Sequence, residues 1–309
     1  MENRNLIISA FCDIDGMKSG LNISDNADRK AVYYKNVIVS LISFKTANKD
    51  SDVALFTNIT PPEIYCEILR KNDIEIKIYD FDEFNFKNNI SWGLAFYKLC
   101  ALKHAIELDY DNFLIVDNDT YCQSNLDDLW LELEENVLLY DINHRLKIRD
   151  CDLYNKEVFS FTRKKIYPTN YGGEFIAGSK EKLKVFINEC SEIFNQMLKN
   201  DFKTNFGDEF IVRLAAYNNK KMIKNSSGYI FRYWTKSFRL VSTCYKYNEV
   251  SIIHVPDEKE DGMLKLYKCI LKKGKIPTKE YVWKVLHLVK PAFKQRVKNL
   301  IKKILKRDF

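Results

Sequence analysis

The sequence lacks the features that mark several specialised classes of protein. No segment approaches the ~20 consecutive apolar residues that a membrane-spanning helix needs. The first apolar stretch directly follows Met1-Glu2-Asn3-Arg4-Asn5 and is too short for the apolar region of a secretory signal peptide. We therefore expect a cytoplasmic protein that does not span a membrane.

Cysteines are present, but never in the spacing that binds structural zinc. The eight cysteines lie at positions 12, 66, 100, 122, 151, 190, 244 and 269, with no Cys-x-x-Cys pair. This pattern indicates neither a zinc site nor a compact disulfide framework, so reduced thiols are the simpler interpretation. A Gly-x-Gly-x-x-Gly motif is also missing after the first predicted strand, which argues against a dinucleotide-binding enzyme.

What the chain does contain is the composition of an ordinary globular protein. Its 309 residues are 46% apolar and 29% charged, which suffices for one large domain, with or without an appendage. The net charge of +7 is uneven, because residues 284–309 carry nine Lys/Arg and one acid, whereas the rest carries 40 basic and 41 acidic side chains. Because the body is nearly neutral and the tail is basic, the positive net charge does not argue for a nucleic-acid-binding body, and RNA binding by the tail is a weaker option.

Apolar runs and helical stretches alternate along the first half of the chain. This order predicts an α/β fold with a largely parallel sheet that helices cover on both faces. After residue 120 the expected strands 137–141 and 157–162 follow one another without a long helix between them, so mixed or antiparallel additions are expected. The expected strands are 6–11, 53–57, 74–79, 113–116, 137–141, 157–162, 171–178 and 251–254, and the expected helices are 31–46, 61–69, 92–108, 180–199 and 208–217.

An apolar run that ends in two aspartates is the most informative segment. Residues 113–116 read as a short buried strand, and Asp117-Asn118-Asp119 follow it. Ligands of open α/β sheets bind at the carboxyl ends of strands, so both carboxylates can turn toward one Mg²⁺ or Mn²⁺ that keeps positions open for phosphate oxygens. The alternative is a solvated turn or a helix cap. The pattern favours an enzyme that neutralises a diphosphate.

The order of the motifs resembles that of metal-dependent glycosyltransferases with the GT-A fold. An Asp-x-Asp closes the fourth strand, and a Gly-Gly segment, an acidic pair that opens a helix and a late histidine follow, within residues 4–260. Families 8 and 6 are the most similar patterns, and family 8 includes bacterial lipopolysaccharide galactosyltransferases with a basic, amphipathic tail. The resemblance implies a GT-A domain over residues 1–276, with a Rossmann-like nucleotide-binding half and a mixed central sheet, and an amphipathic helical segment over 277–309.

The resemblance also implies an activity and a metal site. The enzyme would be a hexosyltransferase that moves a sugar from a nucleotide diphosphate donor, such as UDP-galactose, to a saccharide of lipopolysaccharide, O-antigen or capsule. Asp117, Asp119 and His254 would bind Mn²⁺ or Mg²⁺. After the histidine the family continues with a Gly and a Lys-Pro-Trp run, whereas this chain has Val255-Pro256-Asp257-Glu258. A structural, hydrogen-bonding histidine is the alternative.

Donor-binding residues follow from the same resemblance. The end of the first strand would hold the nucleobase and ribose, the lysine before the metal strand would contact phosphate or sugar, and the glycine pair would let the backbone approach the transferred sugar. The alternatives are a plain core strand, a solvated helix face and a simple turn. The residues are Ala10, Phe11, Cys12, Lys98, Asp117, Asn118, Gly172, Gly173 and Glu174.

Asp208 and Glu209 are the predicted catalytic residues. They follow Gly207 at the start of a predicted helix, where similar enzymes place a carboxylate beneath the anomeric carbon or a base for the acceptor. Glycosyl transfer needs such a group because its transition state resembles an oxocarbenium ion. The alternative is that Asp208 caps the helix and favours its dipole.

The C-terminal residues have the pattern of a basic amphipathic helix. Pro291 fits its start, and basic residues fill the face opposite the apolar stripe. Such a helix binds an anionic membrane, each basic side chain contributing about 1 kcal/mol, or it packs on the body. We expect a peripheral protein at the inner face of the cell membrane with a lipid-linked or oligosaccharide acceptor. The apolar stripe is Phe293, Val297, Leu300, Ile301, Ile304 and Leu305.

Two other functions fit parts of the sequence. Asp117-Asn118-Asp119-Thr120 matches the Asp-x-Asp-x-Thr motif of haloacid-dehalogenase-type phosphatases, in which Asp117 would be the nucleophile. That motif normally lies on the first strand of its fold, whereas three predicted strands precede it here. A non-catalytic adaptor that docks at membranes through residues 284–309 is the third possibility.

Overall fold

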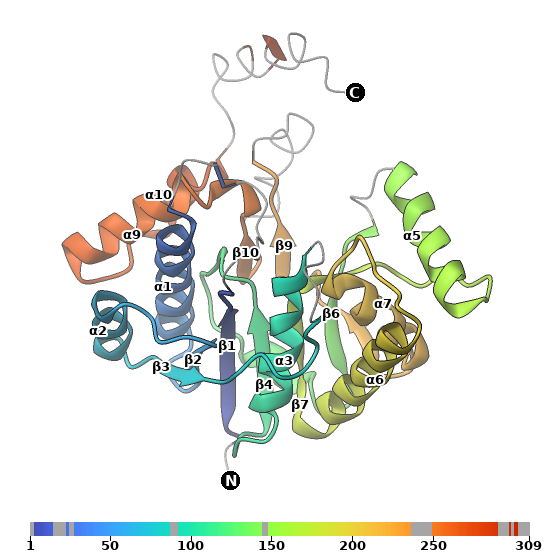
Figure 1. Cartoon of the computed structure of the whole chain (residues 1–309). Coiled ribbons are helices and arrows are strands. Elements are labelled where there is room, and N and C mark those ends of the chain that lie inside the picture. The colour runs from blue at the N-terminus through green and yellow to red at the C-terminus, as the bar shows by residue number, and fades with distance from the viewer. Residues whose placement is uncertain are drawn as a thin grey trace.

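The central element of the protein is a mixed seven-stranded sheet. The structure, a computed structural model, describes residues 3–14, 23–24, 28–86, 92–143, 148–235, 249–289, 297 and 300–301. Within these residues the strand order is β3-β2-β1-β4-β7-β6-β8. A second, three-stranded sheet has the order β5-β10-β9. This mixed α/β architecture confirms the predicted fold class (Figure 1).

The first half of the chain forms the parallel part of the large sheet. Strands β1 to β4 run parallel to one another, as the alternation of strands and helices predicted. The strands are β1 (Asn5–Phe11), β2 (Asp52–Thr57), β3 (Glu75–Ile78) and β4 (Asn112–Val116), and the connecting helices are α1 (Arg29–Ala47), α2 (Glu63–Lys71), the 3-10 helix η1 (Gly93–Phe96) and α3 (Tyr97–Ala105).

The second half adds antiparallel strands and the small sheet. Strand β7 (Tyr171–Ser179) runs antiparallel to β4 and to β6 (Val137–Asp141), and β8 (Ile223–Asn225) pairs parallel with β6. The small sheet consists of β5 (Thr120–Cys122), β9 (Ile230–Arg232) and β10 (Ile252–His254). The other elements are α4 (Asp127–Leu131), α5 (Ile148–Thr162), α6 (Lys180–Lys199), α7 (Asp208–Asn218), η4 (Pro256–Glu258), α9 (Gly262–Lys273) and α10 (Lys279–Val285).

Two predicted elements were wrong. Residues 157–162, expected as a strand, form the end of helix α5. Their aromatic and β-branched residues imitate a strand locally, but Tyr154 and Val158 are both buried at the i, i+4 spacing of one helix face. The long helix expected over 92–108 is interrupted, because it begins as the 3-10 helix η1 and α3 ends at Ala105.

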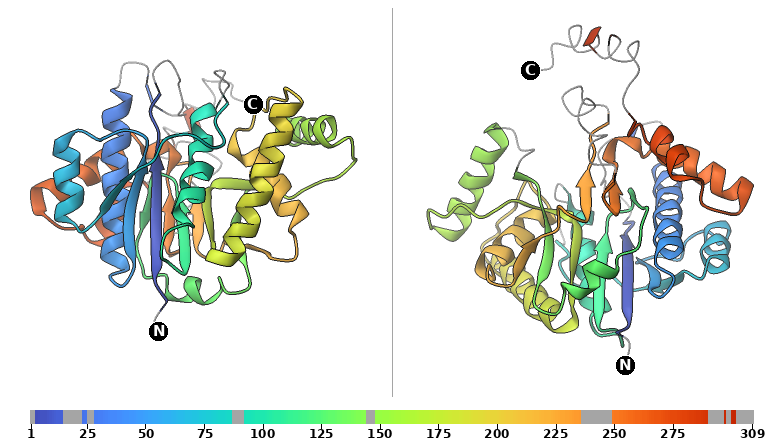
Figure 2. Two further views of the ribbon diagram at one scale, coloured as in Figure 1. Left: turned by 60° about the horizontal axis from the view of Figure 1, so that its bottom comes forward. Right: turned by 180° about the vertical axis from the view of Figure 1, so that it is seen from behind.

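Both faces of the large sheet are buried, each under its own helices. Leu6 and Ile8 of β1 belong to an apolar cluster with α3, α6 and α7, whereas Ile7 between them belongs to a cluster with α1, α9 and α10. Successive side chains of a strand point to opposite faces, so one apolar run supplies both layers. Figures 1 and 2 show the helices on the two sides of the sheet.

The start of the predicted C-terminal segment packs on the body. Val282, Leu286 and Leu288 are fully buried in the α1-side cluster, and Trp283 Nε1 donates to Gln123 Oε1 at 2.8 Å. The division at residue 277 stays a prediction. Most of the amphipathic tail, residues 290–296, 298–299 and 302–309, lies outside the described residues. In the described part of the chain, no helix combines the length and the apolarity that crossing a membrane requires.

Candidate active site

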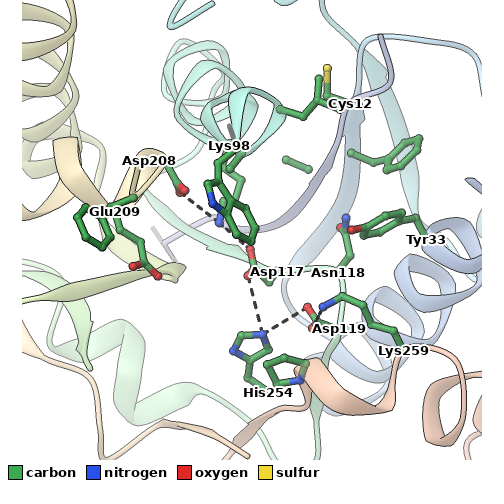
Figure 3. Close-up of a pocket in the computed structure, with 18 of the residues that line it drawn as sticks. Cys12, Tyr33, Lys98, Asp117, Asn118, Asp119, Asp208, Glu209, His254 and Lys259 are labelled. Atoms are coloured by element: carbon green, nitrogen blue, oxygen red, sulfur yellow. Dashed lines mark hydrogen bonds and ion pairs between the residues drawn. The ribbon is translucent and has the colours of Figure 1, made fainter. Parts of the chain in front are cut away.

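The carboxyl ends of β1 and β4 border a cavity of about 530 Å³. Most of the predicted site residues line it, although they come from segments far apart in the sequence (Figure 3). Gly172, Gly173 and Glu174 lie behind this lining instead. The predicted residues that line the cavity are Ala10, Phe11, Cys12, Lys98, Asp117, Asn118, Asp119, Asp208, Glu209 and His254.

Strand pairing brings the late histidine to the aspartates. His254 ends β10 and lies opposite Thr120 in the antiparallel pairing of β10 with β5. The next residue, Val255, donates its backbone N–H to the Asp119 carbonyl at 3.0 Å. His254 Nε2 therefore lies 3.3 Å from Asp119 Oδ1 and 3.8 Å from Asp117 Oδ2. One ligand atom from each of the three residues lies within 4.8 Å of the others.

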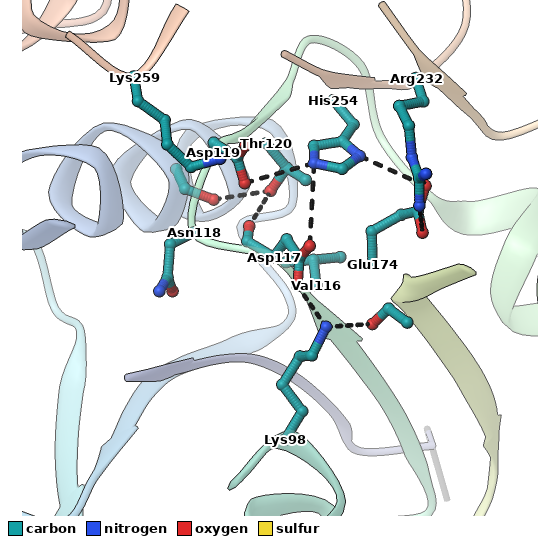
Figure 4. Close-up of polar contacts among 12 residues, drawn as sticks. Lys98, Val116, Asp117, Asn118, Asp119, Thr120, Glu174, Arg232, His254 and Lys259 are labelled. Atoms are coloured by element: carbon teal, nitrogen blue, oxygen red, sulfur yellow. Dashed lines mark hydrogen bonds and ion pairs between the residues drawn. The ribbon is translucent and has the colours of Figure 1, made fainter. Parts of the chain in front are cut away.

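Two lysines each bind one oxygen of an aspartate carboxylate. Lys98 Nζ lies 2.8 Å from Asp117 Oδ1, and Lys259 Nζ lies 2.6 Å from Asp119 Oδ2. The other oxygen of each aspartate faces His254 (Figure 4). Lys259 was not among the predicted site residues. The one feature of the sequence that could have indicated it is its position five residues after the candidate histidine.

The residues fit a divalent metal ion. Carboxylate oxygens suit Mg²⁺ and Mn²⁺, and an imidazole ligand adds affinity for a transition metal. Asp119 and His254 are both buried. Burial lowers the pKa of His254, but Asp119 and Glu174 outweigh burial and raise it to about 9. The site therefore stabilises positive charge between its carboxylates.

Glu174 lies behind His254 rather than on the cavity wall. Its Oε1 lies 3.4 Å from His254 Nδ1, the position from which a carboxylate orients a metal-binding histidine. Arg232 of β9 donates to both Glu174 oxygens, each at 2.5 Å. Although burial alone would raise the pKa of Glu174, Arg232 and His254 hold it well below its usual range. The sequence around Arg232 has no motif that marks this role.

The glycine pair allows this close packing. A Cβ on Gly172 would lie 1.8 Å from Glu174 Oε2, and a Cβ on Gly173 would lie 2.1 Å from Asp208 Oδ2. Both positions therefore need glycine, because protein side chains approach the backbone closely there. The predicted contact of the two glycines with the donor stays a prediction.

Lys98 connects the candidate metal-binding group, Asp117, Asp119 and His254, to the predicted catalytic pair. Its Nζ lies 3.2 Å from Asp208 Oδ2 and donates to the Gly173 carbonyl at 2.9 Å. The side chain is 14% exposed, so Lys98 does not lie on a solvated helix face. Burial raises the pKa of Asp208, and Lys98 offsets only part of this effect.

Glu209, the second residue of α7, also lines the cavity. It accepts a hydrogen bond from Tyr154 OH at 2.7 Å and lies 3.3 Å from Arg232 Nη2. Burial raises the pKa of Glu209 despite Arg232. Gly207 directly before the pair has φ +58°, a conformation that favours glycine; it is also the N-cap residue of α7.

The wall near β1 has a hydrogen-bonded backbone and several cations. Asp13 N–H donates to Asn58 Oδ1, and Asn58 Nδ2 returns a bond to the Asp13 carbonyl, both at 2.9 Å. Arg29, Lys30 and Lys259 also line this side of the cavity. Positive charge on this side of the cavity suits a phosphate-bearing ligand.

Comparison with solved structures identifies the fold as one like that of GT-A glycosyltransferases. The crystal structure of mouse xyloside xylosyltransferase 1, apo form, superposes with a TM-score of 0.51 over 80% of this chain and 96% of that chain, at 10% sequence identity. At this identity the likeness shows the fold alone. No protein-family model matches the sequence, and no curated protein sequence matches it either.

Proposed function

We propose that this protein is a metal-dependent glycosyltransferase with a nucleotide sugar as donor. One observation carries the proposal: Asp117, Asp119 and His254 turn one ligand atom each toward a common point at the edge of a 530 Å³ cavity. A resident Mn²⁺ or Mg²⁺ would neutralise the diphosphate of the donor and so assist its departure. The fold supports the proposal, because it is the fold in which a known glycosyltransferase is built.

The other side chains have complementary tasks in this proposal. Lys98 and Lys259 hold the aspartates and add positive charge beside the diphosphate. Glu174 and Arg232 orient His254. Asp208 and Glu209 are the carboxylates that stabilise the oxocarbenium-like sugar or accept the proton of the acceptor hydroxyl. Retention of configuration is the outcome that the resemblance to families 8 and 6 implies.

We further propose a UDP-sugar, such as UDP-galactose, as donor and a lipid-linked saccharide of the cell surface as acceptor. Charge segregation supports action at the cytoplasmic face of a membrane: residues 262–309 carry 15 Lys/Arg and 2 acids, whereas residues 1–261 carry 34 and 40. Within this basic part, Lys268, Lys272 and Lys273 of α9 are exposed, beside the 49% exposed Leu271. Such a surface attracts anionic lipid headgroups.

Thermal-shift measurements with UDP-, GDP- and CMP-sugars, with and without Mn²⁺, test the donor proposal. We expect a UDP-sugar to raise the melting temperature only when the metal is present, and Asp117→Ala to remove the effect. Absence of any metal-dependent nucleotide shift would contradict the proposal. Hydrolysis of p-nitrophenyl phosphate that depends on Asp117 would indicate the phosphatase alternative instead.

A further inference from the structure

Helix α5 forms one wall of the cavity although it lies apart from the sheet (Figures 1 and 2). Among its described side chains, those of Tyr154, Glu157 and Val158 are buried. Tyr154 OH donates to Glu209 at 2.7 Å, and Glu157 accepts from Thr204 Oγ1 at 2.7 Å. Two polar side chains of α5, those of Tyr154 and Glu157, are thus directed at residues 204–209.

Further contacts join α5 to residues 204–209 and to helix α7. Glu157 Oε1 also accepts from Asn205 Nδ2 at 2.6 Å, and Asn155 accepts from Arg213 Nη2 at 3.1 Å. The ring of Tyr154 stacks on Phe206, and the Arg213 guanidinium lies 4.7 Å from the centre of that ring. Several hydrogen bonds and a ring stack thus hold α5 and residues 204–209 together as one wall.

This wall differs in chemistry from the wall near β1. Tyr154, Asn205, Phe206 and Glu209 all line the cavity; we call these four residues the α5 wall. Phe206 is partly exposed, whereas Tyr154 behind it is buried. An accessible aromatic face beside an amide and a carboxylate suits a ligand with an apolar face and hydroxyl groups.

Charge assigns the two walls to different ligands. Arg29, Lys30 and Lys259 line the side near β1, and Figure 3 shows Tyr33 and Glu209 on opposite sides of Asp117. Arg232, which borders the α5 wall, is bound by two carboxylates, Glu174 and Glu209, whereas Lys30 and Lys259 each pair with one, Asp13 and Asp119. Among the described residues, an anionic group at the α5 wall would therefore meet the Glu209 carboxylate, and Arg232 beside it is already shared between Glu174 and Glu209.

We propose that the α5 wall is the acceptor subsite and that it binds a neutral sugar ring, an inference that rests on the proposed function. The ring lies against Phe206, with a hydroxyl directed at Glu209. Tyr154 is a positioning residue, because it supports Phe206 by stacking and holds Glu209 by its hydroxyl group. The acceptor terminus is accordingly an uncharged saccharide and not a phosphorylated or carboxylated sugar.

Saturation-transfer NMR tests the subsite in the presence of UDP and Mg²⁺, which is diamagnetic and leaves the probe signals sharp. The probes are methyl β-D-galactopyranoside, methyl α-D-glucopyranoside and lactose as neutral sugars, and glucuronic acid and galactose 6-phosphate as anionic ones. We expect signals from neutral probes, a loss of about fivefold or more in Phe206→Ala and unchanged UDP signals. The control is Phe159→Ala, since Phe159 is an α5 aromatic that is 53% exposed and does not line the cavity.

The conservative variant Tyr154→Phe separates positioning from folding. It keeps the ring that supports Phe206, so neutral probes should still bind, with a smaller loss of affinity than in Phe206→Ala. Metal-dependent hydrolysis of the UDP-sugar should fall about tenfold in kcat with little change in KM, since a hydrogen bond to a charged group is lost. Three results would each overturn the inference: probe binding in Phe206→Ala equal to that of the unaltered protein, binding of the anionic probes only, or no probe binding. If UDP itself fails to bind the unaltered protein, the proposed function fails and not the subsite alone.

Discussion

Among single residues, the two aspartates of the metal-binding group differ in what surrounds them. The Asp117 side chain is 28% exposed, whereas that of Asp119 is 4% exposed. Asp119 also has Lys259 and His254 within ion-pair distance. Burial alone would raise the pKa of Asp119, but these two cations hold it well below its usual range. The two positions should therefore respond differently to substitution.

Asp117→Ala should abolish transfer while leaving stability nearly unchanged, because Asp117 is partly solvated. We expect a loss of at least about 10³-fold in turnover, as for removal of a main electrostatic group, with a change of at most ~1 kcal/mol in the free energy of unfolding. Activity assays and urea denaturation measure the two quantities. Asp50→Asn, at an exposed turn residue, is the control; equal turnover in both variants would refute the metal role.

Asp119→Asn should impair both function and folding. Removing this carboxylate charge leaves Lys259 and His254 buried beside a neutral group, and breaking a buried ion pair in this way costs about 3–5 kcal/mol. Urea denaturation should show the loss, and Mn²⁺ titration should show weakened binding. A variant that unfolds at the same urea concentration as the unaltered protein would contradict this view of the site.

Glu174→Gln tests the group behind the histidine. It keeps the volume but removes the charge that binds Arg232 and orients His254. We expect Mn²⁺ affinity to fall about 10–100-fold, the usual effect of losing an outer partner of a metal-binding histidine. Calorimetric titration with Mn²⁺ measures it. Unchanged affinity would mean that Glu174 serves the fold alone.

Among the elements, strand β7 is the one whose close packing the site requires. It lies between β4 and β6, and its two glycines allow Glu174 and Asp208 to approach the backbone. The glycine-punctuated pattern predicted a strand here correctly. It did not predict that the space left by the glycines is filled by carboxylates from β7 itself and from α7.

Gly173→Ala should therefore disturb the catalytic pair. The added Cβ would lie 2.1 Å from Asp208 Oδ2 and 2.9 Å from Lys98 Nζ, so both groups must move. Overpacking of this kind typically costs about 1–3 kcal/mol, and we expect turnover to fall more than tenfold. Gly228→Ala is the matched control, since a Cβ there meets nothing within 4 Å. Equal activity of the two variants would contradict the predicted crowding.

For the complete chain, the position of a C-terminal truncation decides its effect. Deleting 290–309 should leave the melting temperature nearly unchanged and weaken sedimentation with phosphatidylglycerol vesicles, most strongly at low salt. Deleting 284–309 also removes Leu286 and Leu288 from the core, and each lost core leucine costs about 2–5 kcal/mol. Equal vesicle binding of the unaltered protein and the 290–309 deletion would refute the membrane anchor.

The succession of apolar runs determined the fold class, because strand and helix periods are local properties of a chain. The same local interpretation failed at residues 157–162. These residues belong to helix α5, and the contacts that hold this helix, of Tyr154 with Glu209 and of Glu157 with Thr204, join positions far apart in the sequence. The Asp-x-Asp at the end of β4 could also be recognised locally, because the apolar residues of the strand and the polar residues at its end are adjacent in the sequence.

Tertiary structure alone decided which residues join that motif. His254 reaches the aspartates through the pairing of β10 with β5, and Arg232 comes from a neighbouring strand of the same small sheet. Such pairings depend on which surfaces are buried together, and burial is a property of the folded chain. For the same reason Glu174 came to lie behind the histidine, because the ion pair with Arg232 compensates the cost of burying its charge.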